Sequence, residues 1–171
     1  MTQPRGPLLD VRERLTPADH QTHRRYAFEV PTSTRRLNIH VAYAPETVGP
    51  AQSRQLIERA TEQQSEGLRA AVGEQLARQW RAECDQTQAP VRINNLLTIS
   101  LDDARGGYRG ACHRHAPDQD LFVGHHQASP GLTPGPLPDG EWTLTLSVHT
   151  LASAYCEVSI QIGADTASSP P

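Results

Sequence analysis

The sequence predicts a mainly β fold: an antiparallel β-sandwich or jelly-roll-like domain with one α-helical insertion at about residues 51–84. Three observations lead to this prediction. Seven to nine short segments repeat apolar residues at every second position, as half-buried strands do. Most of the 14 prolines and 12 glycines fall between these segments, where turns are needed. A single long segment is helical in character, which excludes a regular alternation of strands and helices.

The amino-terminal part of the predicted sandwich has three candidate strands. The first covers residues 8–15, and the second covers Tyr26–Val30, which stops at Pro31. The third is the clearest of the three, because its large apolar residues recur with period two and therefore share one face. These residues are Leu37, Ile39, Val41 and Tyr43, and the opposite face carries Asn38, His40 and Ala42.

The carboxy-terminal part begins with a candidate strand at Leu96–Leu101, and residues 102–107 form its turn. A loop rich in proline and glycine occupies residues 129–140. The last two strands are separated by residues 149–154, a linker short enough for a hairpin. The remaining candidate strands are residues 108–112, 121–124, 142–148 and 155–162.

The segment from Ala51 to Cys84 contains no proline and is rich in Gln, Glu, Arg and Ala, all compatible with a helix. An apolar stripe recurs at every fourth position, which is typical of an amphipathic helix lying on another surface. We favour packing against the domain's own sheet, and a partner groove or a dimer contact is the alternative. Gly67 and Gly73 weaken the middle, so one bent helix or two shorter ones are both compatible. The stripe consists of Leu68, Val72, Leu76 and Trp80.

The length and composition favour one domain over residues 1–163, followed by a disordered tail at residues 164–171. The net charge of -3 argues against a general nucleic-acid binder, which would have a basic excess. No segment reaches the roughly 18 apolar residues of a membrane span, and residues 1–15 lack the apolar run of a signal peptide. Three cysteines without paired spacing do not indicate a disulfide framework, so a cytoplasmic location is the default expectation.

Several short blocks then occur in an order that resembles a known family. They are Asn95-Leu96-Leu97, Tyr108-Arg109-Gly110 and the Pro-Gly-Pro…Gly-x-Trp pattern that ends at Trp142. This order is similar to the amino-terminal β-sandwich that precedes the catalytic domain of some bacterial metallohydrolases of the polymerase-and-histidinol-phosphatase (PHP) type. The resemblance covers roughly residues 25–163 apart from the helical segment, and it implies an accessory domain.

The sequence departs from that family where catalysis is concerned. The metal-binding histidines of such enzymes belong to a separate barrel that opens with an Asp-x-His-x-His element, and no position here matches it. We therefore expect no catalytic residue and no cofactor. No Gly-x-Ser-x-Gly, Walker or dinucleotide-binding motif occurs either.

One segment, residues 112–126, is rich in potential metal ligands. His113 and His115 would share one face of a strand, and His125 and His126 follow ten residues later. Zinc requires three or four converging ligands, which closeness in sequence does not ensure. The other potential ligands nearby are Cys112, Asp118 and Asp120.

We therefore expect a non-catalytic β-sandwich module that serves protein interaction or assembly, accessory to a hydrolase. A homodimer or a protein partner would be contacted through the helical insertion, without nucleic acid or membrane. One alternative is a metal-binding protein that uses residues 112–126. Another is a small-molecule or glycan-binding module that works at the loop of residues 129–140.

Overall fold

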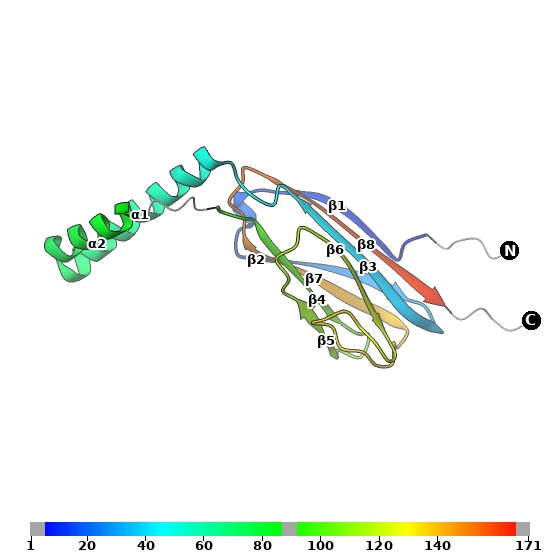
Figure 1. The fold of residues 1–171 in the computed structure, drawn as a ribbon. Helices are drawn as coiled ribbons and strands as arrows, with labels where there is room; N and C mark the ends of the chain where they lie inside the picture. Colours follow the sequence, from blue (N-terminus) through cyan, green and yellow to red (C-terminus); the bar gives the residue numbers. More distant parts are fainter. Residues whose placement is uncertain (1–5, 87–91, 167–171) are drawn as a thin grey trace, which may run out of the picture. The chain divides into compact units, whose positions relative to one another are not determined.

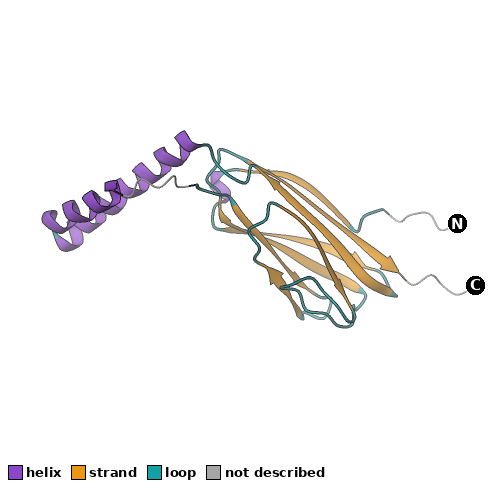
Figure 2. Ribbon diagram, viewed as in Figure 1, coloured by secondary structure: helices purple, strands orange, loops and turns teal. Residues whose placement is uncertain are grey.

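The computed structural model describes residues 6–86 and 92–166 of the chain. The chain divides into two compact units (Figures 1 and 2). One contains the residues up to Glu46 and from Asn95 onward, and the other is Thr47–Asn94. The first unit is an antiparallel β-sandwich and the second is helical, which confirms the predicted fold class of a β-sandwich with a helical insertion.

The sandwich consists of two four-stranded sheets with the orders β1-β8-β3-β6 and β2-β7-β4-β5. All of the strand pairs are antiparallel. In each sheet the two outer pairs of strands have strand numbers that add to nine: β1 with β8 and β3 with β6, and β2 with β7 and β4 with β5. A long two-stranded ribbon that folds over on itself gives this pattern. The strands are β1 (Leu9–Leu15), β2 (Thr22–Val30), β3 (Thr34–Ala44), β4 (Leu96–Asp102), β5 (Tyr108–Cys112), β6 (Asp118–Gly124), β7 (Gly140–Thr150) and β8 (Cys156–Thr166).

The inward positions of both sheets form one hydrophobic core, as the period-two pattern predicts. Trp142 is fully buried in this core, and its indole Nε1–H donates a hydrogen bond of 2.8 Å to the carbonyl of Pro138. This bond satisfies the one polar atom that the ring brings into the core. The other large side chains that are fully buried in this core are Leu15, Leu37, Ile39, Leu97, Leu101, Leu144, Leu146, Ile160, Ile162, Val30 and Val123.

The prediction that the last two strands form a hairpin is wrong, because β7 and β8 belong to different sheets. The buried side chain of Asn95 explains the difference. Its Oδ1 accepts hydrogen bonds from the backbone N–H groups of Ala152 and Ser153, and its Nδ2 donates to the carbonyl of Pro45. The linker is therefore held as an arch that crosses from one sheet to the other.

The predicted disordered tail begins too early. Strand β8 continues through Thr166, and Ala164 and Asp165 pair with Leu37 and Arg36 of the long strand β3. Residues 164–166 thus have a backbone partner that their own sequence does not reveal. The rest of the predicted tail, residues 167–171, lies outside the described residues.

The loop between β6 and β7 closes one side of the sandwich. Its backbone bonds to strand β5 of one sheet through Ala111 N–H to Gly131 O (3.0 Å), and to strand β6 of the other through Gly135 N–H to Gly124 O (3.1 Å). The loop therefore covers the edges of both sheets, which would otherwise present unpaired backbone groups. Gly110 has a φ of 99° and lies against this loop, where side-chain atoms would not fit.

Buried Arg109 holds the loop in place. Its guanidinium donates hydrogen bonds to the carbonyl oxygens of Pro136 (Nη1, 2.7 Å) and Thr133 (Nη2, 3.0 Å), and it pairs with Asp103 at 3.4 Å. Burial raises the pKa of Asp103, but hydrogen bonds from the Gly107 and Arg105 backbone and from Arg109 lower it by more. The pKa of Asp103 is therefore below its ordinary value, and the carboxylate is charged at neutral pH.

The opposite side of the sandwich, at the edges β1 and β2, carries inward-pointing charge. Glu13 of β1 accepts a hydrogen bond from the hydroxyl of Tyr26 in β2. Next to this pair, the carboxylate of Asp19 accepts a bond of 2.5 Å from the guanidinium of Arg24. Charges that point inward at an edge discourage pairing with a further strand.

The helical unit contains helices α1 (Pro50–Val72) and α2 (Glu74–Gln86), so the insertion forms two helices rather than one. Gly73, with a φ of 91°, separates them, in agreement with its expected weakening effect. The ends of the unit meet at a β-bridge between Thr47 and Asn94. A salt bridge of 2.8 Å from Arg81 of α2 to Glu62 of α1 ties the two helices together. Among the described residues, no helix is both long enough and apolar enough to span a membrane.

The close approach at Gly110 leads to a stability prediction. A Cβ atom at this position would lie 2.1 Å from the Gly131 carbonyl oxygen, in a backbone conformation that strains L-residues. We expect Gly110→Ala to lower the free energy of unfolding by roughly 2–4 kcal/mol in a denaturant titration. Gly163→Ala is the matched control, because a Cβ there meets nothing within 4 Å, and it should leave stability unchanged or raise it by up to about 1 kcal/mol. Equal effects of the two substitutions would contradict this prediction.

Candidate functional site

The outer face of sheet β1-β8-β3-β6 combines polar side chains with very small ones. The register places outward side chains of the four strands in rows, such as Asp10, Gln161, His40 and Asp120. The next row toward the end of β8 has Gly163 beside Asn38, and the row on the other side has Ser159 beside Ala42. Small side chains between larger polar ones leave two hollows in this face.

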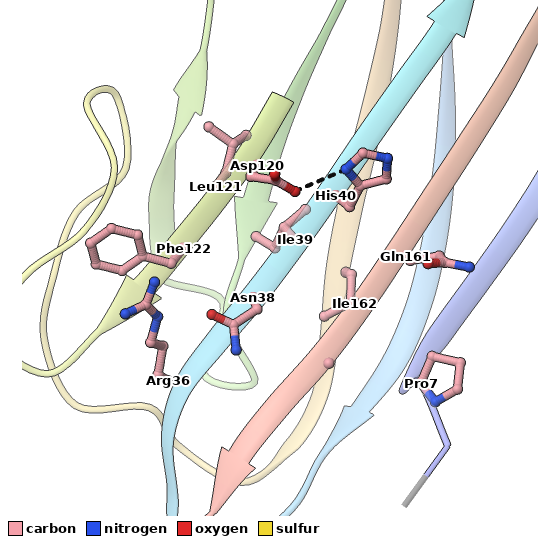
Figure 3. Close-up of a pocket in the computed structure, with 11 residues that line it drawn as sticks. Pro7, Arg36, Asn38, Ile39, His40, Asp120, Leu121, Phe122, Gln161 and Ile162 are labelled. Atoms are coloured by element: carbon pink, nitrogen blue, oxygen red, sulfur yellow. Dashed lines mark hydrogen bonds and ion pairs between the residues drawn. The ribbon is translucent and has the colours of Figure 1, made fainter. Parts of the chain in front are cut away.

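The first hollow has a volume of about 430 Å³ (Figure 3). Arg36, Asn38 and Phe122 lie toward one end of it, and His40 with Asp120 lies toward the other. Strands β3, β6 and β8 and the segment before β1 all contribute to its lining. The lining residues are Pro7, Arg36, Asn38, Ile39, His40, Asp120, Leu121, Phe122, Gln161, Ile162 and Gly163.

The polar side chains of the first hollow are positioned by their neighbours. His40 Nδ1 lies 2.9 Å from Asp120 Oδ1, and Asn38 Nδ2 donates to Asp165 Oδ2 at 3.1 Å. Because a carboxylate only accepts, Nδ1 of His40 carries the proton in this pair, which leaves Nε2 as an acceptor when the imidazole is neutral. The Asp120 side chain is 92% exposed and keeps acceptor capacity for a ligand.

An arginine lies over an aromatic ring at the Phe122 end of the first hollow. The Cζ atom of Arg36 is 3.8 Å from the centroid of the Phe122 ring, within the range of a cation–π interaction. The ring holds the guanidinium close to the face of the sheet, and the guanidinium covers that side of the ring. Arg36 therefore offers N–H donors to a ligand, whereas Phe122 offers little free ring surface on the covered side.

A second hollow of about 400 Å³ lies on the same face, further along β3 and β8. The outward side chains Ala42, Ala44 and Ser159 leave it open, and Arg12 and Asp118 stand on either side. Its other lining residues are Tyr43, Pro117, Glu157 and Val158. The two hollows thus share the central strands β3 and β8, and the row that contains Gln161 and His40 lines the first hollow on the side toward the second.

The structure does not bring the predicted metal ligands together. His113 and His115 follow the end of β5, whereas His125 and His126 follow the end of β6, and all four are exposed. The seven residues of β6 lie between the two pairs and span about 20 Å of strand. Over residues 6–86 and 92–166, no group of three or more His, Cys, Asp or Glu side chains is placed to hold a metal ion.

Buried Cys112 also takes no part in a ligand cluster. Its thiol lies 3.5 Å from the carbonyl oxygen of Pro130, inside the core, and burial raises its pKa. The second predicted ligand site, the loop of residues 129–140, makes backbone bonds to both sheet edges and to Arg109. These bonds give most of the loop a structural role.

The apolar stripe of the helical insertion is partly buried and partly exposed in the hairpin that α1 and α2 form. Ala77 is buried, Leu68 and Trp80 are half-buried, and Val72 and Leu76 are 49% and 55% exposed. Val72 and Leu76 flank Gly73, at the point where α1 ends and α2 begins. The turn end of the hairpin therefore presents two large apolar side chains.

The sequence did not indicate the two hollows, although it placed Asn38, His40 and Ala42 on the face opposite the core. The missing information was the register between strands, which brings Asp120 and Gly163 beside them. A comparison with protein-family models and with curated proteins finds no match for this chain.

Proposed function

We propose that the chain is a non-catalytic binding module whose ligand lies on the outer face of sheet β1-β8-β3-β6. The observation that carries this proposal is the pair of hollows in line on a polar, four-stranded face. In the first hollow, the hydrogen bonds of His40 to Asp120 and of Asn38 to Asp165 position polar side chains before a ligand binds, which lowers the cost of ordering them. The hydrophobic core beneath the face holds its strands in register and supports the same role.

We further infer that the sandwich is a jelly roll. The eight strands and the orders β1-β8-β3-β6 and β2-β7-β4-β5 fit a double-sheet roll of two Greek keys. Lectin domains are among the proteins with this architecture, which supports a binding role by analogy of fold alone. The resemblance to the PHP-associated sandwich supports a role accessory to a hydrolase.

A second candidate function is assembly through the helical hairpin. Val72 and Leu76 expose large apolar side chains on either side of Gly73, next to half-buried Leu68. Contact with another protein surface would remove this apolar area from water, which is favourable. A second copy of the chain is the simplest partner for such a contact.

The binding proposal is tested with a thermal-shift screen of the full chain against neutral sugars, nucleotides, amino acids and short peptides. At least one class should raise the melting temperature. Gly163→Leu, which fills the first hollow without a backbone clash, should abolish that rise. Thr145→Leu on the outward side of β7, in the other sheet, is the matched control and should leave the rise intact. A ligand response that survives Gly163→Leu would place the site elsewhere.

The assembly candidate is tested by size-exclusion chromatography with light scattering over a range of protein concentrations. We expect a dimer that the double variant Val72→Asp/Leu76→Asp converts to a monomer, because charge at these positions makes burial unfavourable. Ala70→Asp, which adds charge at another exposed position of α1, should leave the dimer intact. A wild-type chain that stays monomeric at every concentration would rule out self-assembly.

A further inference from the structure

We propose that the two hollows together bind one neutral, linear oligosaccharide that lies along β3 and β8. This inference rests on the proposed function and adds the chemical class and the direction of the ligand. It depends on three properties of the outer face: the alignment of the hollows, the mixture of donors and acceptors around them, and the balance of charge across them.

The alignment of the hollows favours an elongated ligand. Gly163 lies in the first hollow and Ser159 in the second, and both are outward residues of β8. Four residues of extended strand separate them, which corresponds to about 13 Å. A ligand that contacts both positions must be longer than a single sugar ring. The row between them, with Gln161 and His40, would contact the middle of such a ligand.

The side chains around the hollows suit hydroxyl groups, each of which donates one hydrogen bond and accepts others. Asp120 and Asp118 accept, Arg36 and Arg12 donate, and the amides of Asn38 and Gln161 can do both. When its imidazole is neutral, His40 adds an acceptor at Nε2, since Nδ1 lies 2.9 Å from the Asp120 carboxylate, which only accepts. A polyhydroxyl chain can satisfy donors and acceptors in succession along this face.

The charges on the outer face favour a ligand without net charge. Arg12 lies in the same row as Asp118, and Arg36 and Asp120 line the same hollow. Glu157 of the second hollow is paired with Arg14 at 2.6 Å. A polyanion such as a nucleic acid would approach Asp118 and Asp120, and a cationic ligand would approach the two arginines. Like-charge contacts of this kind disfavour binding of both classes.

The test uses two-dimensional ¹⁵N–¹H spectra of the full chain titrated with cellohexaose, xylohexaose, mannohexaose and maltohexaose, and with glucose, xylose and mannose. The nucleotides, amino acids and short peptides of the thermal-shift screen are titrated in the same way. One hexasaccharide should shift the backbone amides of residues 38–42 and 159–163, and its monosaccharide should bind at least about tenfold more weakly. Gly163→Leu and Ala42→Leu, which fill one hollow each, should each weaken the hexasaccharide about tenfold. Thr145→Leu should leave the affinity unchanged.

The outcomes separate this inference from the proposed function. If only Gly163→Leu weakens binding and the monosaccharide binds as well as the hexasaccharide, the ligand is small and the elongated site is wrong. If no sugar shifts these amides but nucleotides, amino acids or peptides do, the oligosaccharide is wrong and the binding face stands. If no class of compound shifts them, both proposals fall.

Discussion

The Arg109 guanidinium, buried beside the Asp103 carboxylate, holds the loop that joins β6 to β7. It donates to carbonyls on that loop and lies with its Cζ atom 5.4 Å from the ring centroid of core residue Trp142. Removing one member of a buried charge pair typically costs roughly 3–5 kcal/mol, a large part of the roughly 5–15 kcal/mol that stabilises a whole domain. The closed side of the sandwich therefore depends on this side chain together with the backbone bonds of the loop to β5 and β6.

The sequence blocks behind the family resemblance lie at structural positions. Asn95 fixes the arch between the two sheets, and Trp142 fills the core and donates a hydrogen bond to Pro138. Arg109 donates hydrogen bonds to the β6–β7 loop, and Gly110 lets the loop backbone approach closely. These residues serve closure of the sandwich, and the two hollows use a different set of side chains. A likeness carried by such blocks therefore bears on the fold and leaves the ligand open.

Much of the fold could be predicted because burial on one face of a strand imposes period two on the sequence. Leu37, Ile39, Val41 and Tyr43 show this pattern, and all four are buried as expected. The break between the helices was also visible, since Gly73 is a poor helix residue. Both features are local, so neighbouring residues contain the information.

What could not be predicted depends on contacts between distant segments. The β7–β8 linker has the length of a hairpin, and only the bonds from Asn95 show that it changes sheets. The four histidines are close in sequence, but strand β6 separates them into pairs. His40 and Asp120 are 80 positions apart in sequence, and only the β3–β6 register makes them neighbours on the outer face.

The role of Arg109 as the clamp of the closing loop is most directly tested by hydrogen exchange of the Arg109→Met variant, which keeps much of the side-chain length without the charge. We expect the amides of Ala111, Thr133 and Gly135 to lose protection, because their hydrogen bonds join the loop to the two sheet edges. Amides in the β3–β8 pairing should stay protected. Unchanged protection at the loop amides would contradict the role assigned to Arg109.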